Sequence, residues 1–414
     1  MKKSTAILIL SALLLCIAAE AQNLPSKWKM SKATKNSFEM LWEADNSHIG
    51  ATECGEGYLD APKCEGMTDG DVWTFHFPVK GLDAGSYFEF DIRLGALEAS
   101  PKYFVVEYLD GKRWKDAGIV KCVGGSNEPA TIIKTLHLKK AIKDGEVLVR
   151  LRVLGDRKCK KDIGPDSDSH VKLMPYGYIG AYATPAGSVA PLDTVKVGYL
   201  GNSFTFVNSA DFILKELAWN EGHFLDMRVN TYPGAYFRSH LGLEGSLDVI
   251  SEGGYDWVIL QDQSAQAARY GRDADKSTMD FTKTIAKVIR YFAPDTRLLY
   301  EQTWAYSQSN YGGFGSFESF DENSTKGAAA LADAINAEVS PIAQAFAIVR
   351  AERPDIEIYS TDDHHPAAYG AYLKACCNYL MMFGSPFKSD KADFALDPAT
   401  CAYLRDVAQR TCLR

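Results

Sequence analysis

The spacing of hydrophobic residues changes near the middle of this 414-residue chain. Between Val72 and Leu154, hydrophobic and polar residues alternate, as in YFEFDIRL (87–94) and VLVRLRVL (147–154). Alternation with a period of two buries one face of a strand and exposes the other, which is typical of antiparallel sheets. Asp110-Gly111, between two such stretches, is a hairpin signal. The first half of the chain is therefore predicted to form a β-sandwich.

The second half follows a different pattern, in which short hydrophobic runs alternate with amphipathic helical stretches such as STMDFTKTIAKVIRYFA. This alternation predicts a parallel sheet covered by helices on both faces. The Gly- and Ser-rich segment 306–324 is predicted to be a loop, and a loop of this length is usually either functional or disordered. The expected strands are VKVGYL (195–200), LDMRVN (225–230), DWVILQ (256–261), RLLYEQ (297–302), EVSPI (338–342) and IEIYS (356–360).

The first 21 residues have a basic tip, a hydrophobic run and the small-x-small pattern Ala19-Glu20-Ala21. This pattern indicates a secretory signal peptide, whereas a lipoprotein signal through Cys16 is less well matched. The segment ATPAGSVAPLD is typical of a linker. We therefore expect a signal peptide over 1–21, a β-sandwich domain over 22–182, a linker over 183–193 and a second domain over 194–414.

Composition limits the classes of partner. Hydrophobic residues make up 46% of the chain and charged residues 24%, as in ordinary globular proteins. Removing Lys2, Lys3 and Glu20 with the signal changes the net charge from −8 to −9. A mildly acidic chain without basic clusters predicts no nucleic-acid partner, and no later segment is expected to span a membrane. Eight cysteines remain after removal of the signal, an even number that permits disulfides in an exported protein.

Polar segments follow four of the expected strands, where ligands bind in parallel α/β sheets. Gly201-Asn202-Ser203 follows the first, Tyr232-Pro233-Gly234 the second and Gln261-Asp262-Gln263-Ser264 the third. The last is Ser360-Thr361-Asp362-Asp363-His364-His365-Pro366. A carboxylate three residues before a histidine is suitably placed to bind its Nδ1, which leaves Nε2 to accept a serine proton.

These segments resemble the SGNH hydrolases, the GDSL-type esterase and lipase superfamily, over roughly 195–385. Gly201-Asn202-Ser203 is similar to the Gly-Asp-Ser block of that family, and Asp362-x-x-His365-Pro366 to its Asp-x-x-His block. The resemblance implies Ser203 as nucleophile, His365 as base and Asp362 as the group that orients it. It also implies an oxyanion hole formed by the N–H groups of Ser203 and Gly234 and by the side chain of Gln263.

Two positions depart from the family pattern. Asn202 replaces the usual Asp, a small change if this residue only shapes the turn. Gln263 stands where the family has Asn, so its amide reaches an oxyanion only if the loop is set back. The loss of one such donor costs about 2.7–4 kcal/mol of transition-state stabilisation.

Several other roles are open at these positions. Asp363 is an alternative to Asp362, and Asp-Asp-His-His suggests a metal, although adjacent residues seldom converge on one ion. We expect neither a metal nor a cofactor. Trp304, Tyr306 and Tyr236 are weaker candidates for substrate contacts, with core packing or solvated loops as the alternatives.

The predicted architecture is a flavodoxin-like three-layer α/β/α SGNH hydrolase domain preceded by an all-β sandwich. The predicted function is an exported serine esterase, periplasmic or extracellular, that removes O-acetyl or other short acyl groups from carbohydrates. Alternatives are a lipase or thioesterase, favoured if 306–324 forms a hydrophobic lid, and a glycan-binding protein whose serine site has decayed. A glycosidase that uses Asp262 and Asp362 ranks lower.

Overall fold

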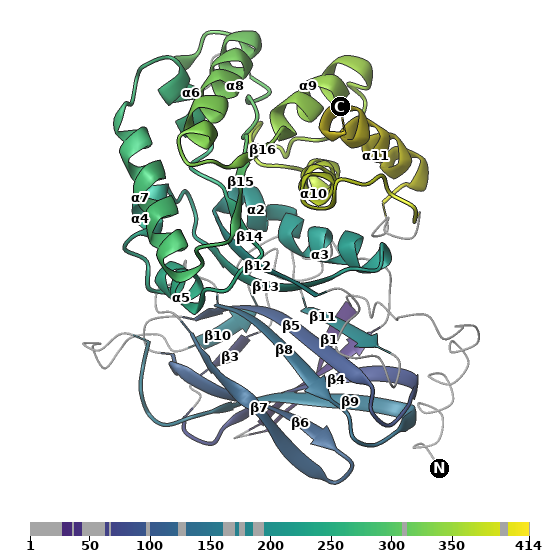
Figure 1. The fold of residues 1–414 in the computed structure, drawn as a ribbon. Coiled ribbons are helices and arrows are strands. Elements are labelled where there is room, and N and C mark those ends of the chain that lie inside the picture. The colour runs from purple at the N-terminus through teal and green to yellow at the C-terminus, as the bar shows by residue number, and fades with distance from the viewer. Residues whose placement is uncertain are drawn as a thin grey trace.

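The computed structural model describes residues 27–34, 37–43, 63–65, 68–96, 100–122, 130–159, 170–173, 179–184, 194–308, 313–389 and 396–413. The expected signal peptide lies outside these residues, as does most of the expected linker. Among these described residues, two parts are evident: only strands are found up to residue 184, and strands alternate with helices from residue 194 onward (Figure 1).

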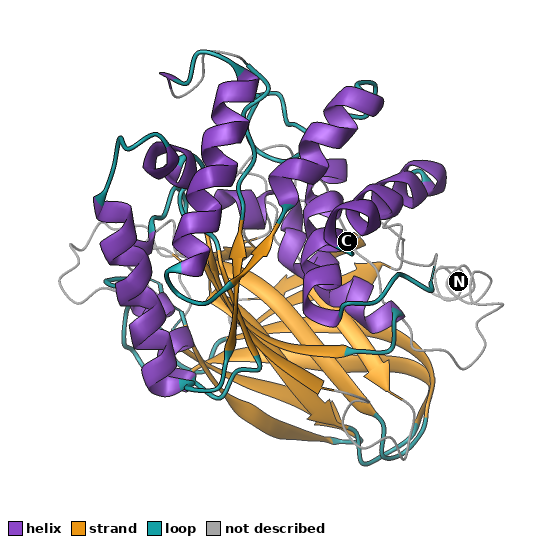
Figure 2. Ribbon diagram, turned by 45° about the horizontal axis from the view of Figure 1, so that its top comes forward, coloured by secondary structure: helices purple, strands orange, loops and turns teal. Residues whose placement is uncertain are grey.

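The first part is a sandwich of two sheets (Figures 1 and 2). One sheet has six strands in the order β1-β2-β4-β9-β6-β7, and the other has β11-β5-β10-β3 with β8 paired to β5. Every pair within 72–153 is antiparallel, as the alternation predicts, whereas β2 and β4 are parallel. The strands are β1 (Lys27–Thr34), β2 (Ser37–Glu43), β3 (Lys63–Glu65), β4 (Val72–Leu82), β5 (Tyr87–Ala96), β6 (Tyr103–Asp110), β7 (Arg113–Lys121), β8 (Ala130–His137), β9 (Ile142–Val153), β10 (His170–Leu173) and β11 (Ile179–Thr184).

The core of the sandwich is formed by the inward-facing positions of the alternating strands. Phe75 and Phe77 of β4 pack against Phe90 of β5, with ring centroids 5.4 and 5.7 Å apart. Cys122 and Cys159 are buried in this core as free thiols, and burial raises the pKa of Cys159 to about 11. These thiols therefore act as packing groups in this structure.

The second part is built on a parallel sheet of five strands, β12 (Thr194–Gly201), β13 (Phe224–Thr231), β14 (Trp257–Leu260), β15 (Arg297–Glu301) and β16 (Glu338–Ser340). Their order is β13-β12-β14-β15-β16, which is the flavodoxin-like order 2-1-3-4-5. The helices are α2 (Ser203–Phe206), the 3₁₀ turn η2 (Val207–Ser209), α3 (Ala210–Asn220), α4 (Phe237–His240), α5 (Glu244–Glu252), α6 (Gln266–Gly271), α7 (Ser277–Phe292), α8 (Phe317–Asp333), α9 (Ile342–Glu352), α10 (Ala368–Phe383) and α11 (Pro398–Cys412).

Helices cover both faces of this sheet, as Figure 1 shows. Trp257 and Ile259 of β14 face the cluster formed with α3, α10 and α11, whereas Val258 and Leu260 face the one formed with α5, α7 and α8. Burial of both faces explains why the strands appear in the sequence as short continuous hydrophobic runs. The expected three-layer α/β/α fold is therefore confirmed. Within the described ranges, no helix is both long and hydrophobic enough to cross a membrane.

Two expectations for the second half need correction. Residues 356–360 form no strand: Tyr359 makes one isolated bridge with Pro366, and Ala367 N–H donates to the Ile358 carbonyl. The segment therefore folds back on the stretch that carries the histidines instead of extending the sheet. The expected loop 306–324 ends early because α8 begins at Phe317, capped by the Ser316 side chain, which accepts from Ser319 N–H.

The sandwich covers the edge of the parallel sheet at β13, where β8 contacts β13 (Figure 1). An ion pair between Lys215 of α3 and Glu89 of β5 joins the two parts, and their side chains are 2% and 3% exposed. Nearer the surface, Lys121 of β7 lies 2.5 Å from Asp248 of α5. The two parts are therefore joined by a buried charge pair as well as by surface ion pairs.

The buried interdomain pair predicts a large cost for removing one partner. We expect Glu89→Gln to lower the free energy of unfolding by about 3–5 kcal/mol, because Lys215 would keep its charge without this partner. Asp248→Asn is the control and should cost less than about 1 kcal/mol, because Asp248 is 52% exposed. Urea denaturation followed by circular dichroism measures both, and equal losses would contradict the prediction.

Candidate active site

The polar segments that follow the strands meet around one cavity of about 330 Å³. It opens at the carboxyl ends of β12, β13 and β14, together with the histidine-bearing segment. This volume is at the small end of the range for ligand pockets. The cavity is lined by Asn202, Ser203, Phe204, Pro233, Gly234, Gln263, Ser264, His364 and His365.

The turn that presents Ser203 requires a close approach of chain segments. At Gly201, the last residue of β12, a Cβ would lie 2.7 Å from Thr205 Oγ1 and 3.1 Å from Gln261 Oε1. A side chain at this position would displace the side chain of Thr205 on α2. Ser203 is the first residue of α2. The N–H groups of the first turn of a helix have no carbonyl acceptor within that helix.

Asn202 holds this turn through four hydrogen bonds, and its side chain is buried. Its Oδ1 accepts from Phe204 N–H at 3.0 Å and from Gln261 Nε2 at 2.7 Å. Its Nδ2 donates to the carbonyls of Ala235 and Asp262, both at 3.0 Å. An Asp here would lack the two N–H donors. The replacement of Asp by Asn is therefore not the minor change that the sequence suggested, because this turn depends on an amide.

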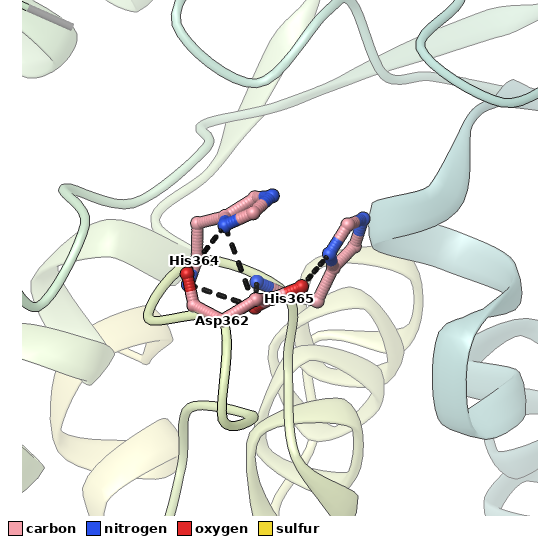
Figure 3. A group of neighbouring side chains, drawn as sticks. All are labelled: Asp362, His364 and His365. Atoms are coloured by element: carbon pink, nitrogen blue, oxygen red, sulfur yellow. Dashed lines mark hydrogen bonds and ion pairs between the residues drawn. The ribbon is translucent and has the colours of Figure 1, made fainter. Parts of the chain in front are cut away.

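Ser203, His365 and Asp362 form one hydrogen-bonded chain. The Ser203 Oγ is 2.8 Å from His365 Nε2, and His365 Nδ1 is 2.5 Å from Asp362 Oδ2. Figure 3 shows the imidazole of His365 beside the carboxylate of Asp362. The other oxygen of Asp362 accepts from the backbone N–H groups of His364 and His365 at 3.1 and 3.0 Å. Asp362 therefore fixes both the turn and the ring.

Asp363 faces away from this chain. Its φ of +67° turns the backbone, so its carboxylate accepts from the Ser307 hydroxyl at 2.7 Å and from the Gln308 amide. Adjacent carboxylates therefore bind different segments, and Asp362 is the one that contacts His365.

The environment lowers the pKa values of both His365 and Asp362. Burial lowers the pKa of His365, and the nearby Asp362 carboxylate only partly opposes this, so the ring is neutral near pH 7. For Asp362, burial acts to raise the pKa, but hydrogen bonds from the His365 side chain and from two backbone N–H groups lower it to about 2. A neutral imidazole between a serine hydroxyl and a carboxylate is the arrangement needed for general-base chemistry.

The same segment also contains a candidate metal cluster. Ligand atoms of Asp362, His364 and His365 lie within 4.8 Å of one another (Figure 3). Both ring nitrogens of His365 are already used, by Asp362 and by Ser203. A metal bound through His365 would have to displace one of these partners, so the cluster fits a proton-transfer chain better than a metal centre.

Two loops bring further hydrogen-bond donors to the cavity. Tyr232 to Ala235 form a turn closed by Ala235 N–H on the Tyr232 carbonyl at 3.0 Å, with Pro233 second and Gly234 third at φ +65°. This is the sequence and backbone sign of a type II turn, in which the N–H of the third residue is not part of the closing bond.

The amide of Gln263 folds back on its own loop. Its Oε1 accepts from Ala265 N–H at 3.1 Å, and its Nε2 donates to the Ser264 hydroxyl at 2.9 Å. The Ser264 hydroxyl is in turn 2.5 Å from Tyr306 Oη. These contacts take up the extra methylene of Gln relative to Asn and fix the orientation of the amide.

One buried carboxylate of the third polar segment ties these loops together. Asp262 is buried, and its Oδ1 accepts from the backbone N–H groups of Phe237 and Gln263 at 3.0 and 2.8 Å. Burial raises its pKa to about 7, although both N–H groups favour the charged form. Asp262 is not among the described residues that line the cavity, which disfavours the glycosidase alternative that paired it with Asp362. A carboxylate directly after a hydrophobic strand was the available signal.

The weaker substrate candidates also need correction. Trp304 is 1% exposed and stacks between Phe204 and Phe346, with centroids 4.5 and 4.2 Å away. Tyr306 is 4% exposed. Both rings lie behind the cavity wall, where they pack instead of offering a stacking face. Tyr236 is half-buried, stacks with Arg238 and is not among the described residues that line the cavity.

A putative SGNH hydrolase and a putative GDSL-like lipase are among the solved structures similar to this chain. A DUF4886 family protein from Bacteroides uniformis has 18% identity and a TM-score of 0.45, over 53% of this chain and 95% of that one. A putative SGNH hydrolase from Slackia heliotrinireducens has 20% identity and a TM-score of 0.39, over 46% and 100%. A family two carbohydrate esterase from Cellvibrio japonicus has 10% identity and a TM-score of 0.32, over 78% and 97%. No family model and no curated protein matches the sequence.

The four hydrogen bonds of the Asn202 side chain predict that an Asp at this position would destabilise the protein. We expect Asn202→Asp to lower the free energy of unfolding by about 2–5 kcal/mol, because two buried carbonyls would lose their donors. Asn220→Asp is a matched control, because the Asn220 amide donates to one half-buried carbonyl on α3, that of Glu216. Thermal unfolding of both variants measures the difference, and an unchanged melting temperature for Asn202→Asp would contradict the prediction.

Proposed function

We propose that this protein is a serine ester hydrolase. The observation that carries the proposal is the hydrogen-bonded chain from Ser203 through His365 to Asp362, which opens onto a cavity of about 330 Å³. A serine hydroxyl, a neutral imidazole and a carboxylate in this order form the arrangement that transfers acyl groups on unrelated folds.

In this mechanism, Ser203 Oγ attacks the acyl carbon of the ester while His365 Nε2 takes the hydroxyl proton. Asp362 stabilises the imidazolium that results. The tetrahedral intermediate collapses when its bond to the alcohol oxygen breaks, and His365 returns the proton to the leaving alcohol. Water then attacks the acyl-enzyme with His365 as base again, which releases the acid and frees Ser203.

The oxyanion that forms in both steps needs hydrogen-bond donors. We assign this role to the N–H groups of Ser203 and Gly234 and to Nε2 of Gln263. All three residues line the cavity, and the Ser264 and Ala265 contacts fix the Gln263 amide before substrate binds. A preorganised donor is worth more than one that must reorient during the reaction.

The proposed substrates are O-acetyl or other short acyl esters of carbohydrates. The small volume of the cavity favours a short acyl group, and its polar lining from Asn202, Gln263, Ser264 and His364 suits a hydroxyl-rich alcohol. Against the lipase alternative, Phe314 of the expected lid segment is 7% exposed and stacks on Phe320 at 4.2 Å. Export through the signal peptide, to the periplasm or beyond, is part of this proposal.

The first experiment tests the hydrolase itself. Purified mature protein should hydrolyse p-nitrophenyl acetate, and Ser203→Ala and His365→Ala should each lower kcat by at least about 10³-fold. Asp362→Asn should also impair hydrolysis, whereas Asp363→Asn, its neighbour, should keep kcat within a few-fold of the parent. Circular dichroism verifies that each variant is folded. Equal rates in the parent and Ser203→Ala would exclude Ser203 as the nucleophile.

A series of acyl chain lengths tests the substrate class. We expect kcat/KM to fall from p-nitrophenyl acetate to the octanoate, because the longer chain exceeds the cavity. Acetate release from an acetylated polysaccharide should then depend on Ser203. A rate that rises with chain length would instead favour the lipase or thioesterase alternative.

A further inference from the structure

A buried ion pair lies directly beneath the turn that carries Ser203. Lys374 Nζ is 2.8 Å from Glu301 Oε2, and the two side chains are 0% and 1% exposed. Lys374 also donates to the Phe204 carbonyl at 3.1 Å and to Thr205 Oγ1 at 3.0 Å. An ammonium group has three donors, and this one has three partners. The proposed mechanism uses none of these groups.

The carboxylate of Glu301 joins three elements of the fold. It lies at the end of β15, and its Oε1 accepts from Tyr199 Oη of β12 and from Asn378 Nδ2 of α10, both at 2.5 Å. Lys374 and Asn378 are four residues apart on α10 and therefore lie on one face of that helix. Glu301 thus fixes α10 against the sheet at two successive turns.

This position links the two segments that must meet for catalysis. His365 lies three residues before the start of α10 at Ala368, and Phe204 directly follows Ser203. A bond from Lys374 on α10 to the Phe204 carbonyl therefore ties the base-bearing segment to the nucleophile turn. Because α2 is only four residues long, it has few hydrogen bonds of its own to hold Ser203 in place.

We propose that Lys374 is a positioning residue for ester hydrolysis, which holds the Phe204 carbonyl so that Ser203 Oγ stays within hydrogen-bond reach of His365 Nε2. The inference rests on the proposed function. A displacement of about 1 Å between reacting groups is enough to cost about 100-fold in rate. Lys374 affects the chemistry through the geometry of Ser203 and does not line the cavity.

The test variant is Lys374→Met combined with Glu301→Gln, because Lys374→Met alone would leave a buried carboxylate without its cation. The single Lys374→Met variant gives a second comparison that retains Glu301. Asn378→Leu is the matched control: it also removes a Glu301 contact from the same face of α10 but leaves the Phe204 carbonyl bound. Two readouts are used with the full mature chain: p-nitrophenyl acetate hydrolysis and the rate at which a fluorophosphonate labels Ser203.

The double variant should remain folded by circular dichroism, with kcat lowered about 10- to 100-fold and KM within about twofold of the parent. Labelling of Ser203 should slow by a similar factor, whereas Asn378→Leu should keep kcat within about twofold. A folded Lys374 variant with parental kcat and labelling, or an equal loss in Asn378→Leu, would overturn the positioning role alone. A parent protein that neither hydrolyses the ester nor is labelled would overturn the proposed function, and this inference with it.

Discussion

The site depends on one buried amide. The side chain of Asn202 joins three chain segments, because it accepts from the α2 backbone and donates to the carbonyls of Ala235 and Asp262. Those two carbonyls belong to the loops that carry Gly234 and Gln263. The Asn202 side chain therefore links the position of the serine to the positions of the two loops that carry the surrounding donors.

Buried polar groups recur beneath this site, and each lies where a sheet end meets a loop. Asp262 holds two backbone N–H groups, and Glu301 holds Tyr199 and α10. Such groups add little net stability compared with hydrophobic side chains of the same size, because desolvation offsets much of their attraction. What they supply here is a defined geometry, since each is satisfied by partners in one arrangement.

The sequence was most informative where a single physical rule applied. Hydrophobic alternation predicted the sandwich strands, and continuous hydrophobic runs predicted the parallel sheet, because strand burial follows directly from those patterns. The four polar segments, three of which follow observed strands, predicted which parts of the chain meet around the cavity. Segment 356–360 was wrongly predicted to be a strand because its hydrophobic run resembles one. Its backbone hydrogen bonds are made with residues 365–367 and not with the sheet.

The sequence could not show whether Asp362 or Asp363 contacts His365, because the positive φ of Asp363 decides which carboxylate faces the ring. The role of Lys374 was also hidden, since the sequence does not show which groups a buried lysine contacts.

The cover that the sandwich provides for β13 has a consequence for how the chain folds. An open β13 would present unpaired backbone groups, on which strands from other molecules could add. Because proteins are synthesised from the N-terminus, the residues of the sandwich precede those of β13 along the growing chain. The part of the chain that covers this edge is thus synthesised before the edge itself, which shortens the time for which β13 is open to strands from other molecules.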